Sequence, residues 1–295
     1  MSKRKVSILG CGWLGQALAA TLIDAGVQVR GSARTCEQAR RLTALGIQGF
    51  ALVLAPDLQG EHIDEFFESD TLIISLSPQR NREDTEAVFL SQISALSEAV
   101  RRSAVREAVF ISSTSVYPAR RQALTEADAA NPDSPSGKAL LAAENLLLAQ
   151  TAFQTAVVRF GGLIGYDRHP LRSLRADGFR RDPNLPLNVI HRDDAVRVIL
   201  EILRQGKWGE ALNACCPVHP LRRDYYTKAF RLSGKPEPDF PDFPNERETA
   251  VPKIVSSRKL ISSLNFKFKY PDPMALLDEP KAWSVDFLSP INHLE

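Results

Sequence analysis

The chain has 295 residues, 44% of them hydrophobic, which is enough for one large α/β domain or for two unequal domains. Lysine and arginine number 37 against 35 aspartate and glutamate residues, so the formal net charge is only +2. A chain so evenly balanced has no strong overall field, which argues against nucleic acid or a membrane surface as a partner.

The cysteines and the N-terminus indicate a reduced, cytoplasmic setting. The cysteines stand at positions 11, 36, 215 and 216, with neither metal-ligand spacing nor a disulfide pattern. Basic residues 3–5 and the apolar stretch after them resemble a signal peptide, but three glycines interrupt that stretch. No other stretch is long and apolar enough to span a bilayer. We therefore expect a cytoplasmic protein that holds no metal and contacts no membrane.

Strand-length apolar runs alternate with helical patterns along the first 165 residues. The expected strands are 6–9, 27–32, 50–54, 71–76, 108–112 and 156–160. The expected helices are 14–25, 37–45, 87–103 and 138–149, and glycines follow the first two, as at many helix ends. This alternation predicts an α/β fold with helices on both faces of a parallel sheet. Right-handed crossovers then make it a doubly wound, Rossmann-type sheet.

The pattern becomes looser after Gly165. A strand at 187–190, a helix from about Asp194 and a last strand at 211–215 are expected. Residues 236–252 are rich in proline and aspartate, which predicts an extended surface loop. A lid over a substrate pocket is an equal alternative, because long loops often carry function.

Three glycines, at positions 10, 12 and 15, span the junction of the first expected strand and the first expected helix. In such a place Gly10 permits a tight turn, Gly12 lets the backbone approach a pyrophosphate, and Gly15 allows close packing of helix on strand. The helix start, with Trp13 and Leu14, offers free N–H groups and the positive end of the helix dipole. Strand, glycine turn and helix in this order predict a dinucleotide site.

This motif suggests how the chain is divided. We expect residues 1–165 to form an NAD(P)-binding Rossmann domain. Residues 166–295 are expected to form a smaller C-terminal substrate lobe of mixed structure, whose strands and helices also complete the Rossmann core.

The end of the second strand decides between NAD and NADP. NAD sites place an acid about twenty residues after the glycine turn, to hold the ribose hydroxyls. Here residues 31–35 contain no carboxylate. Arg34 can pair with a 2′-phosphate, and Ser32 and Thr35 can add hydroxyl donors. We therefore expect NADP as the cofactor, with NAD as the alternative. The alternative for Arg34 is a solvent-exposed surface residue that contacts no ligand.

The fourth strand ends in the run Ser75-Leu76-Ser77-Pro78. Ligands of open α/β sheets bind at the carboxyl ends of strands, so Ser75 and Ser77 are expected near the cofactor. Arg80 and Arg82 come next in a loop, where solvent exposure is expected and phosphate contact is the alternative.

Several segments resemble the extended short-chain dehydrogenase/reductase superfamily, and within it the NAD-dependent epimerase/dehydratase group. These segments are 10–15, 110–118, 159–165, 189–195 and 257–266. The runs Gly-Cys-Gly-Trp-Leu-Gly and Ser-Ser-Thr-Ser-Val-Tyr most resemble the atypical, YeeZ-like branch. The resemblance implies NAD(P) binding, oxidoreductase or epimerase-like activity on an unidentified small molecule, and a homodimer formed through two helices of the sheet.

The family mechanism implies three side chains. A serine or threonine bonds the substrate oxygen, a tyrosine exchanges a proton with it, and a lysine four residues later holds the ribose. Ser113 matches the first role. Ser136 stands where the tyrosine is expected and Leu140 where the lysine is expected. Lys138 is no substitute, because two residues along a helix correspond to a rotation of about 200°.

Other side chains could supply the proton. The candidates are Tyr117, Tyr166, His169 and His191. Tyr117 is nearest to Ser113, although a packed aromatic at a strand end is the favoured interpretation. For Asp193 and Asp194, after His191, capping of the following helix is favoured.

Two functions follow from these residues. The first is an NADP(H)-dependent oxidoreductase or epimerase-like enzyme, with Ser113 and Tyr117 as the candidate catalytic residues. The alternative is a non-catalytic NAD(P)-binding protein with a redox-sensing or regulatory role, motivated by Ser136 and Leu140.

Overall fold

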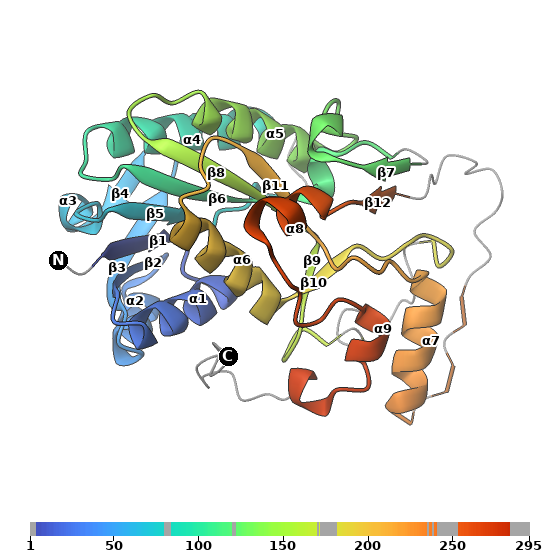
Figure 1. Ribbon diagram of the computed structural model, residues 1–295. Coiled ribbons are helices and arrows are strands. Elements are labelled where there is room, and N and C mark those ends of the chain that lie inside the picture. Colours follow the sequence, from blue (N-terminus) through green and yellow to red (C-terminus); the bar gives the residue numbers. More distant parts are fainter. Residues whose placement is uncertain are drawn as a thin grey trace.

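The computed structural model is organised around an eight-stranded sheet with helices on both faces (Figure 1). It describes residues 4–79, 84–119, 122–169, 171, 182–234, 236–237, 239–240 and 253–283. The strands lie in the order β11-β8-β6-β5-β1-β2-β3-β4. Their bounds are β1 Lys5–Leu9, β2 Gln28–Ala33, β3 Gln48–Leu54, β4 Leu58–Gly60, β5 Thr71–Ile74, β6 Glu107–Ser113, β8 Gln154–Phe160 and β11 Ala211–Ala214. Neighbouring strands are parallel except for the antiparallel pair β3 and β4.

The described helices include two layers that cover the faces of this sheet (Figure 1). Their bounds are α1 Trp13–Asp24, α2 Cys36–Ala44, α3 Ile63–Phe66, α4 Thr85–Arg101, α5 Pro135–Leu148, α6 Arg192–Gln205, α7 Arg222–Leu232, α8 Arg258–Leu264 and α9 Pro273–Leu276. Helices α4 and α5 cover one face, and α1, α2 and α6 cover the other (Figure 1). Each layer buries its own apolar cluster against the sheet. The expected doubly wound parallel fold is confirmed.

Local signals explain most of the element boundaries. Gly26 and Gly46 follow α1 and α2 with φ of +78° and +79°, a conformation that glycine adopts without strain. Helix α5 begins three residues earlier than expected, because Ser134 caps it by accepting from the Gly137 N–H and Pro135 occupies its first position.

The order of the strands places a switch point at β1. From β1 the chain builds β2 and β3 on one side, and then β5, β6, β8 and β11 on the other. The carboxyl ends of these parallel strands share one edge of the sheet. A crevice at such a switch point is where open α/β sheets bind ligands.

Residues after 165 both extend the central sheet and build smaller structures. Strand β11 joins the sheet beside β8, and α6 packs next to α1. The expected strand near residue 187 does not join this sheet. It is β10 (Val189–His191), which pairs with β9 (Gly162–Ile164).

A second small sheet joins distant parts of the chain. Strand β7 (Gln122–Leu124) pairs in parallel with β12 (Lys253–Val255). The proline-rich segment 236–252 lies almost entirely outside the described residues. Among the helices that the structure describes, none is both long and apolar enough to cross a membrane.

Candidate functional site

The turn between β1 and α1 is shaped by its three glycines. Gly10 has a φ of +82°, and a Cβ atom there would lie 2.5 Å from the carbonyl oxygen of Ser75. A Cβ on Gly15 would lie 3.2 Å from Ile8, so this glycine lets α1 approach β1. A Cβ on Gly12 would meet nothing closer than 3.9 Å. Gly10 and Gly15 therefore serve the fold, whereas Gly12 is exposed and has room for a side chain.

Helix α1 begins directly after this turn, at Trp13 and Leu14. Its N-cap residue is Gly12, so no side chain caps the helix, and its first turn contains no acid. The backbone N–H groups of the first turn and the positive end of the helix dipole are thus available to an anion. The residues present fit the pyrophosphate of a dinucleotide.

The three residues expected to read the ribose lie in different environments. Ser32 is buried, and its Oγ accepts a 2.9 Å hydrogen bond from the Gly10 N–H, so its hydroxyl stabilises the backbone of the glycine turn. Thr35 caps α2 by accepting from the Gln38 N–H at 3.2 Å. Arg34 is exposed at the end of β2. Of the three, Arg34 is the one that offers a charged group to solvent.

The serines after β5 also divide into two roles. Ser75 is half-buried, its N–H donates to the Leu9 carbonyl at 2.9 Å, and its own carbonyl lies beneath Gly10. Ser77 is exposed at the same edge of the sheet. Arg80 and Arg82 lie outside the described residues.

Ser113 ends β6 at the carboxyl edge, where it is half-buried. Its Oγ accepts a 3.2 Å hydrogen bond from the Ser115 N–H at the start of a 3₁₀ turn, which leaves the hydroxyl proton free to donate. Lys253 holds the other side of this turn by donating to the carbonyls of Thr114 at 2.6 Å and Tyr117 at 3.0 Å. Sequence reasoning missed Lys253 because it lies on the distant strand β12.

Tyr117 is packed inside the molecule, with 1% of its surface exposed. Its hydroxyl donates to Asn213 Oδ1 at 2.6 Å and accepts from Arg159 Nη1 at 2.8 Å. Burial raises the pKa of Tyr117 to about 12, against the lowering effect of Arg159. The side chain thus has the environment of the packed aromatic, and its hydroxyl does not face the sheet edge as a proton donor would.

Arg159 belongs to a buried polar network that sequence reasoning also missed. Its guanidinium pairs with Glu144 of α5 at 2.6 Å, and the Ser112 hydroxyl donates to the same carboxylate. One signal in the sequence could have revealed the pair. Glu144 lies on the apolar face of α5 beside Leu140 and Leu147, and a carboxylate in that place requires a charged partner.

The structure gives Ser136 and Leu140 no role like that of a tyrosine and a lysine. Leu140 is buried in the apolar cluster beneath α5. Ser136 is half-buried, with its Oγ 3.3 Å from that of Ser134. Lys138 is exposed on α5, as its rotation around the helix predicts.

The expected capping role of Asp193 and Asp194 is wrong. His191 caps α6, since its Nδ1 accepts from the Asp193 N–H at 3.2 Å. Asp194 instead accepts the N–H groups of Lys269 and Tyr270, both at 2.8 Å. The two carboxylates lie within the first turn of α6, where Asp193 accepts from the Tyr166 hydroxyl and Asp194 binds the backbone at residues 269–270.

The other candidate donors are also engaged elsewhere. The Tyr166 hydroxyl donates to Asp193 at 2.9 Å, and burial raises its pKa. The His169 ring packs edge-on against Trp283, with the centroids 4.9 Å apart. Burial lowers the pKa of His191 to about 4, so its ring is neutral near pH 7.

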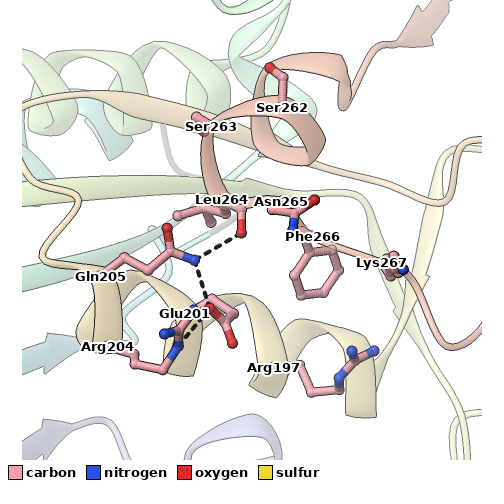
Figure 2. Close-up of a pocket in the computed structure, with 10 residues that line it drawn as sticks. All are labelled: Arg197, Glu201, Arg204, Gln205, Ser262, Ser263, Leu264, Asn265, Phe266 and Lys267. Atoms are coloured by element: carbon pink, nitrogen blue, oxygen red, sulfur yellow. Dashed lines mark hydrogen bonds and ion pairs between the residues drawn. The ribbon is translucent and has the colours of Figure 1, made fainter.

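A separate groove lies between α6 and the C-terminal end of α8 together with the residues that follow it (Figure 2). It is lined by Arg197, Glu201, Arg204, Gln205 and residues 262–267. Glu201 accepts from Arg204 at 2.8 Å and from Gln205 at 2.7 Å, and Gln205 also donates to the Leu264 carbonyl at 2.8 Å. These polar groups largely satisfy one another, and the groove contains none of the expected site residues.

Known proteins resemble the chain along most of its length. Residues 6–176 match the model of the NAD dependent epimerase/dehydratase family. Over 275 residues the chain is 31% identical to Protein YeeZ of Escherichia coli (strain K12), an alignment that covers 92% of this chain and 98% of YeeZ.

Solved structures share the fold at lower identity. A short-chain dehydrogenase/reductase superfamily protein from Agrobacterium tumefaciens with bound NAD has a TM-score of 0.76 at 19% identity, covering 95% of this chain and 96% of that one. UDP-glucuronic acid 4-epimerase from Bacillus cereus in complex with NAD has a TM-score of 0.73 at 17% identity, covering 96% and 98%. With its glycine turn, its sheet order and these matches, the chain belongs to the NAD-dependent epimerase/dehydratase family, as an atypical extended short-chain dehydrogenase/reductase.

Proposed function

We propose that this protein binds a nicotinamide dinucleotide at the glycine turn, prefers NADP(H), and acts as an oxidoreductase or epimerase-like enzyme on a small molecule. The observation that carries the proposal is the uncapped start of α1, where Gly12 is exposed, no side chain caps the helix and the first turn contains no acid. Two proteins of the same fold hold NAD in their solved structures, which supports this choice of ligand.

On the cofactor side, backbone groups and one arginine are the proposed ligands. The N–H groups at Trp13 and Leu14 would meet the pyrophosphate, and Ser77 lies exposed at the same edge. Arg34 would pair with the 2′-phosphate, because residues 31–35 contain no carboxylate to hold ribose hydroxyls.

On the reaction side, Ser113 is the proposed contact with the substrate. A nicotinamide supplies hydride-transfer chemistry when it is bound. The Ser113 hydroxyl can donate to a substrate oxygen, because its Oγ already accepts the Ser115 N–H. Tyr117 is buried in a network, so the proton would reach the substrate from solvent.

Specific observations also favour a second function, a non-catalytic dinucleotide-binding sensor. Leu140 is buried among apolar side chains, and Ser136 carries a short, weakly acidic hydroxyl. This function predicts tight cofactor binding without hydride transfer, and a partner whose binding depends on the redox state of the cofactor.

The first experiment is a calorimetric titration of the apo protein with NADPH and with NADH, in the wild type, Arg34→Ala and Arg40→Ala. We expect NADPH to bind more tightly, and Arg34→Ala to weaken NADPH by at least about tenfold while leaving NADH unchanged. Arg40→Ala removes a charge that is also exposed, on α2, and should change neither the NADPH affinity nor the NADH affinity. Equal affinities in the wild type would contradict the NADP preference, and no binding would contradict the site itself.

A second experiment separates the two functions. Carbonyl compounds and nucleotide sugars are screened for NADPH oxidation or NADP⁺ reduction, with Ser113→Ala and Tyr117→Phe alongside. We expect turnover that Ser113→Ala abolishes. Turnover that survives Ser113→Ala and Tyr117→Phe together would overturn the proposed role of Ser113 and would exclude Tyr117 as the proton donor. Tight binding without turnover in the whole screen would favour the sensor.

A further inference from the structure

The loop at residues 165–169 contacts the side chain of Trp13, the first residue of α1. Asp167 accepts a 2.5 Å hydrogen bond from the indole N–H of Trp13, the first residue of that helix. Tyr166 anchors the other side, with its N–H donating to the Ala282 carbonyl at 2.7 Å. Gly165, at φ +116°, packs so closely on His191 that a Cβ atom would overlap the imidazole ring. The loop is therefore held in place from both sides.

This arrangement brings two guanidinium groups to the ring of Trp13, the residue that follows the glycine turn. Arg168 lies over the Trp13 ring, 4.1 Å from its centroid, and is exposed. Arg192 lies 5.1 Å from the same ring and 4.0 Å from that of Tyr166, but it is buried. Asp167 supplies one negative charge nearby. Arg168 is thus the cation of this group that can turn towards a ligand.

The sheet order says which part of a dinucleotide would meet Arg168. Arg34 follows β2, on one side of β1, whereas the loop of Arg168 follows β8 and β9, on the other side. A dinucleotide spans the crevice at the switch point, with its two halves on opposite sides. Arg34 therefore lies on the side of the adenosine half, and Arg168 on the side of the nicotinamide half.

We propose that Arg168 binds the nicotinamide-side phosphate of the dinucleotide, using the Trp13 ring as the platform that keeps its side chain at the rim of the site. The inference rests on the proposed function. A pyrophosphate brings two negative charges to a helix start whose dipole is equivalent to roughly half a positive charge, so an added cation would strengthen binding. The guanidinium fork also suits two phosphate oxygens.

The test is a calorimetric titration of this 295-residue protein with NADPH, ADP-ribose and 2′,5′-ADP, in the wild type and in Arg168→Met. The methionine keeps an apolar chain on Trp13 but removes the charge. We expect affinity for NADPH and ADP-ribose to fall about tenfold, because both carry the nicotinamide-side phosphate, and affinity for 2′,5′-ADP, which lacks it, to stay unchanged. Arg168→Lys should retain part of the affinity.

Arg223→Met is the matched control, because Arg223 also stacks on an aromatic ring, that of Phe240, and is exposed on α7. It should change none of the three affinities. If the wild type binds NADPH and Arg168→Met binds ADP-ribose equally well, the proposal is overturned while the proposed function stands. If the wild type binds none of the three ligands, both are overturned. An equal loss for 2′,5′-ADP would also overturn the assignment to the nicotinamide side.

Discussion

At the residue scale, the candidate site depends on backbone conformation more than on side chains. Gly10 combines a positive φ with close contact to the Ser75 carbonyl, so that any larger residue would meet two separate obstacles. Gly26 has almost the same φ, yet an added Cβ would meet nothing within 4 Å. A side chain at Gly26 would therefore meet only the strain of the left-handed conformation, whereas one at Gly10 would meet both that strain and a steric overlap.

We predict that Gly10→Ala destabilises the protein more than Gly26→Ala does. The left-handed conformation costs alanine about 1 kcal/mol at both sites. At Gly10 the overlap with a backbone oxygen adds about 2 kcal/mol and displaces the turn. Urea denaturation measures both losses, and titration with NADPH should show weaker binding for Gly10→Ala alone. Equal losses of stability would show that crowding at Gly10 is relieved by local movement.

Residue identity predicted location better than it predicted role. Ser32 and Ser75 lie around the turn, as the motif indicates, but Ser32 uses its hydroxyl to accept a backbone N–H of the turn, and Thr35 uses its own to cap α2. Tyr117 follows Ser113 closely, yet its ring points into the buried network. A pattern of residue types shows which groups are near one another, whereas burial decides which of them can reach a ligand.

At the element scale, α5 joins the candidate site to the core through one buried ion pair. Glu144 of α5 and Arg159 of β8 pair at 2.6 Å, with their side chains 1% and 6% exposed. Ser112, the neighbour of Ser113, donates to the same carboxylate. The pair thus fixes the distance between α5 and the end of β6, where Ser113 lies.

We predict that Glu144→Gln lowers the free energy of unfolding by about 3 to 5 kcal/mol, since it leaves the Arg159 charge buried without its counterion. Glu37→Gln is the control, because the Glu37–Arg41 pair on α2 is exposed and contributes about 0.5 kcal/mol or less. Urea denaturation followed by circular dichroism measures both. Similar small losses for the two variants would show that water reaches Arg159.

At the scale of the whole molecule, the N-terminus of α6 connects three distant segments. His191 caps α6 through Nδ1 and contacts the Ala282 carbonyl through Nε2, 3.3 Å away, which requires the proton on Nε2. Gly165 packs on its ring, and Asp194 holds the backbone of Lys269. A charged imidazole would lose its cap acceptor and would be buried, so this junction depends on a neutral His191.

We predict that stability falls between pH 6.5 and about 4, in part because of His191. Burial lowers its folded pKa to about 4, whereas the unfolded chain takes up a proton near 6.5. The stability that His191 contributes is therefore fully present above pH 6.5 and is lost as the pH falls towards 4. The loss amounts to about 3 kcal/mol.

The variant His191→Asn tests this, because asparagine still caps a helix but does not titrate. Urea midpoints measured from pH 7 to pH 4 should depend less on pH in the variant than in the wild type. His62→Asn is the control, since the His62 side chain is 71% exposed, and it should follow the wild type. A His191→Asn curve parallel to that of the wild type would contradict the prediction.

The sequence by itself determined the doubly wound fold and the glycine turn. These features follow from local periodicity and from backbone conformations that few residues adopt, so they can be predicted from neighbours in the chain. The tertiary structure alone decided that Tyr117 is buried, that Lys253 holds the turn after Ser113, and that Arg168 lies on Trp13. Those contacts join residues far apart in the sequence, and they depend on strand order and side-chain burial, which no local pattern encodes.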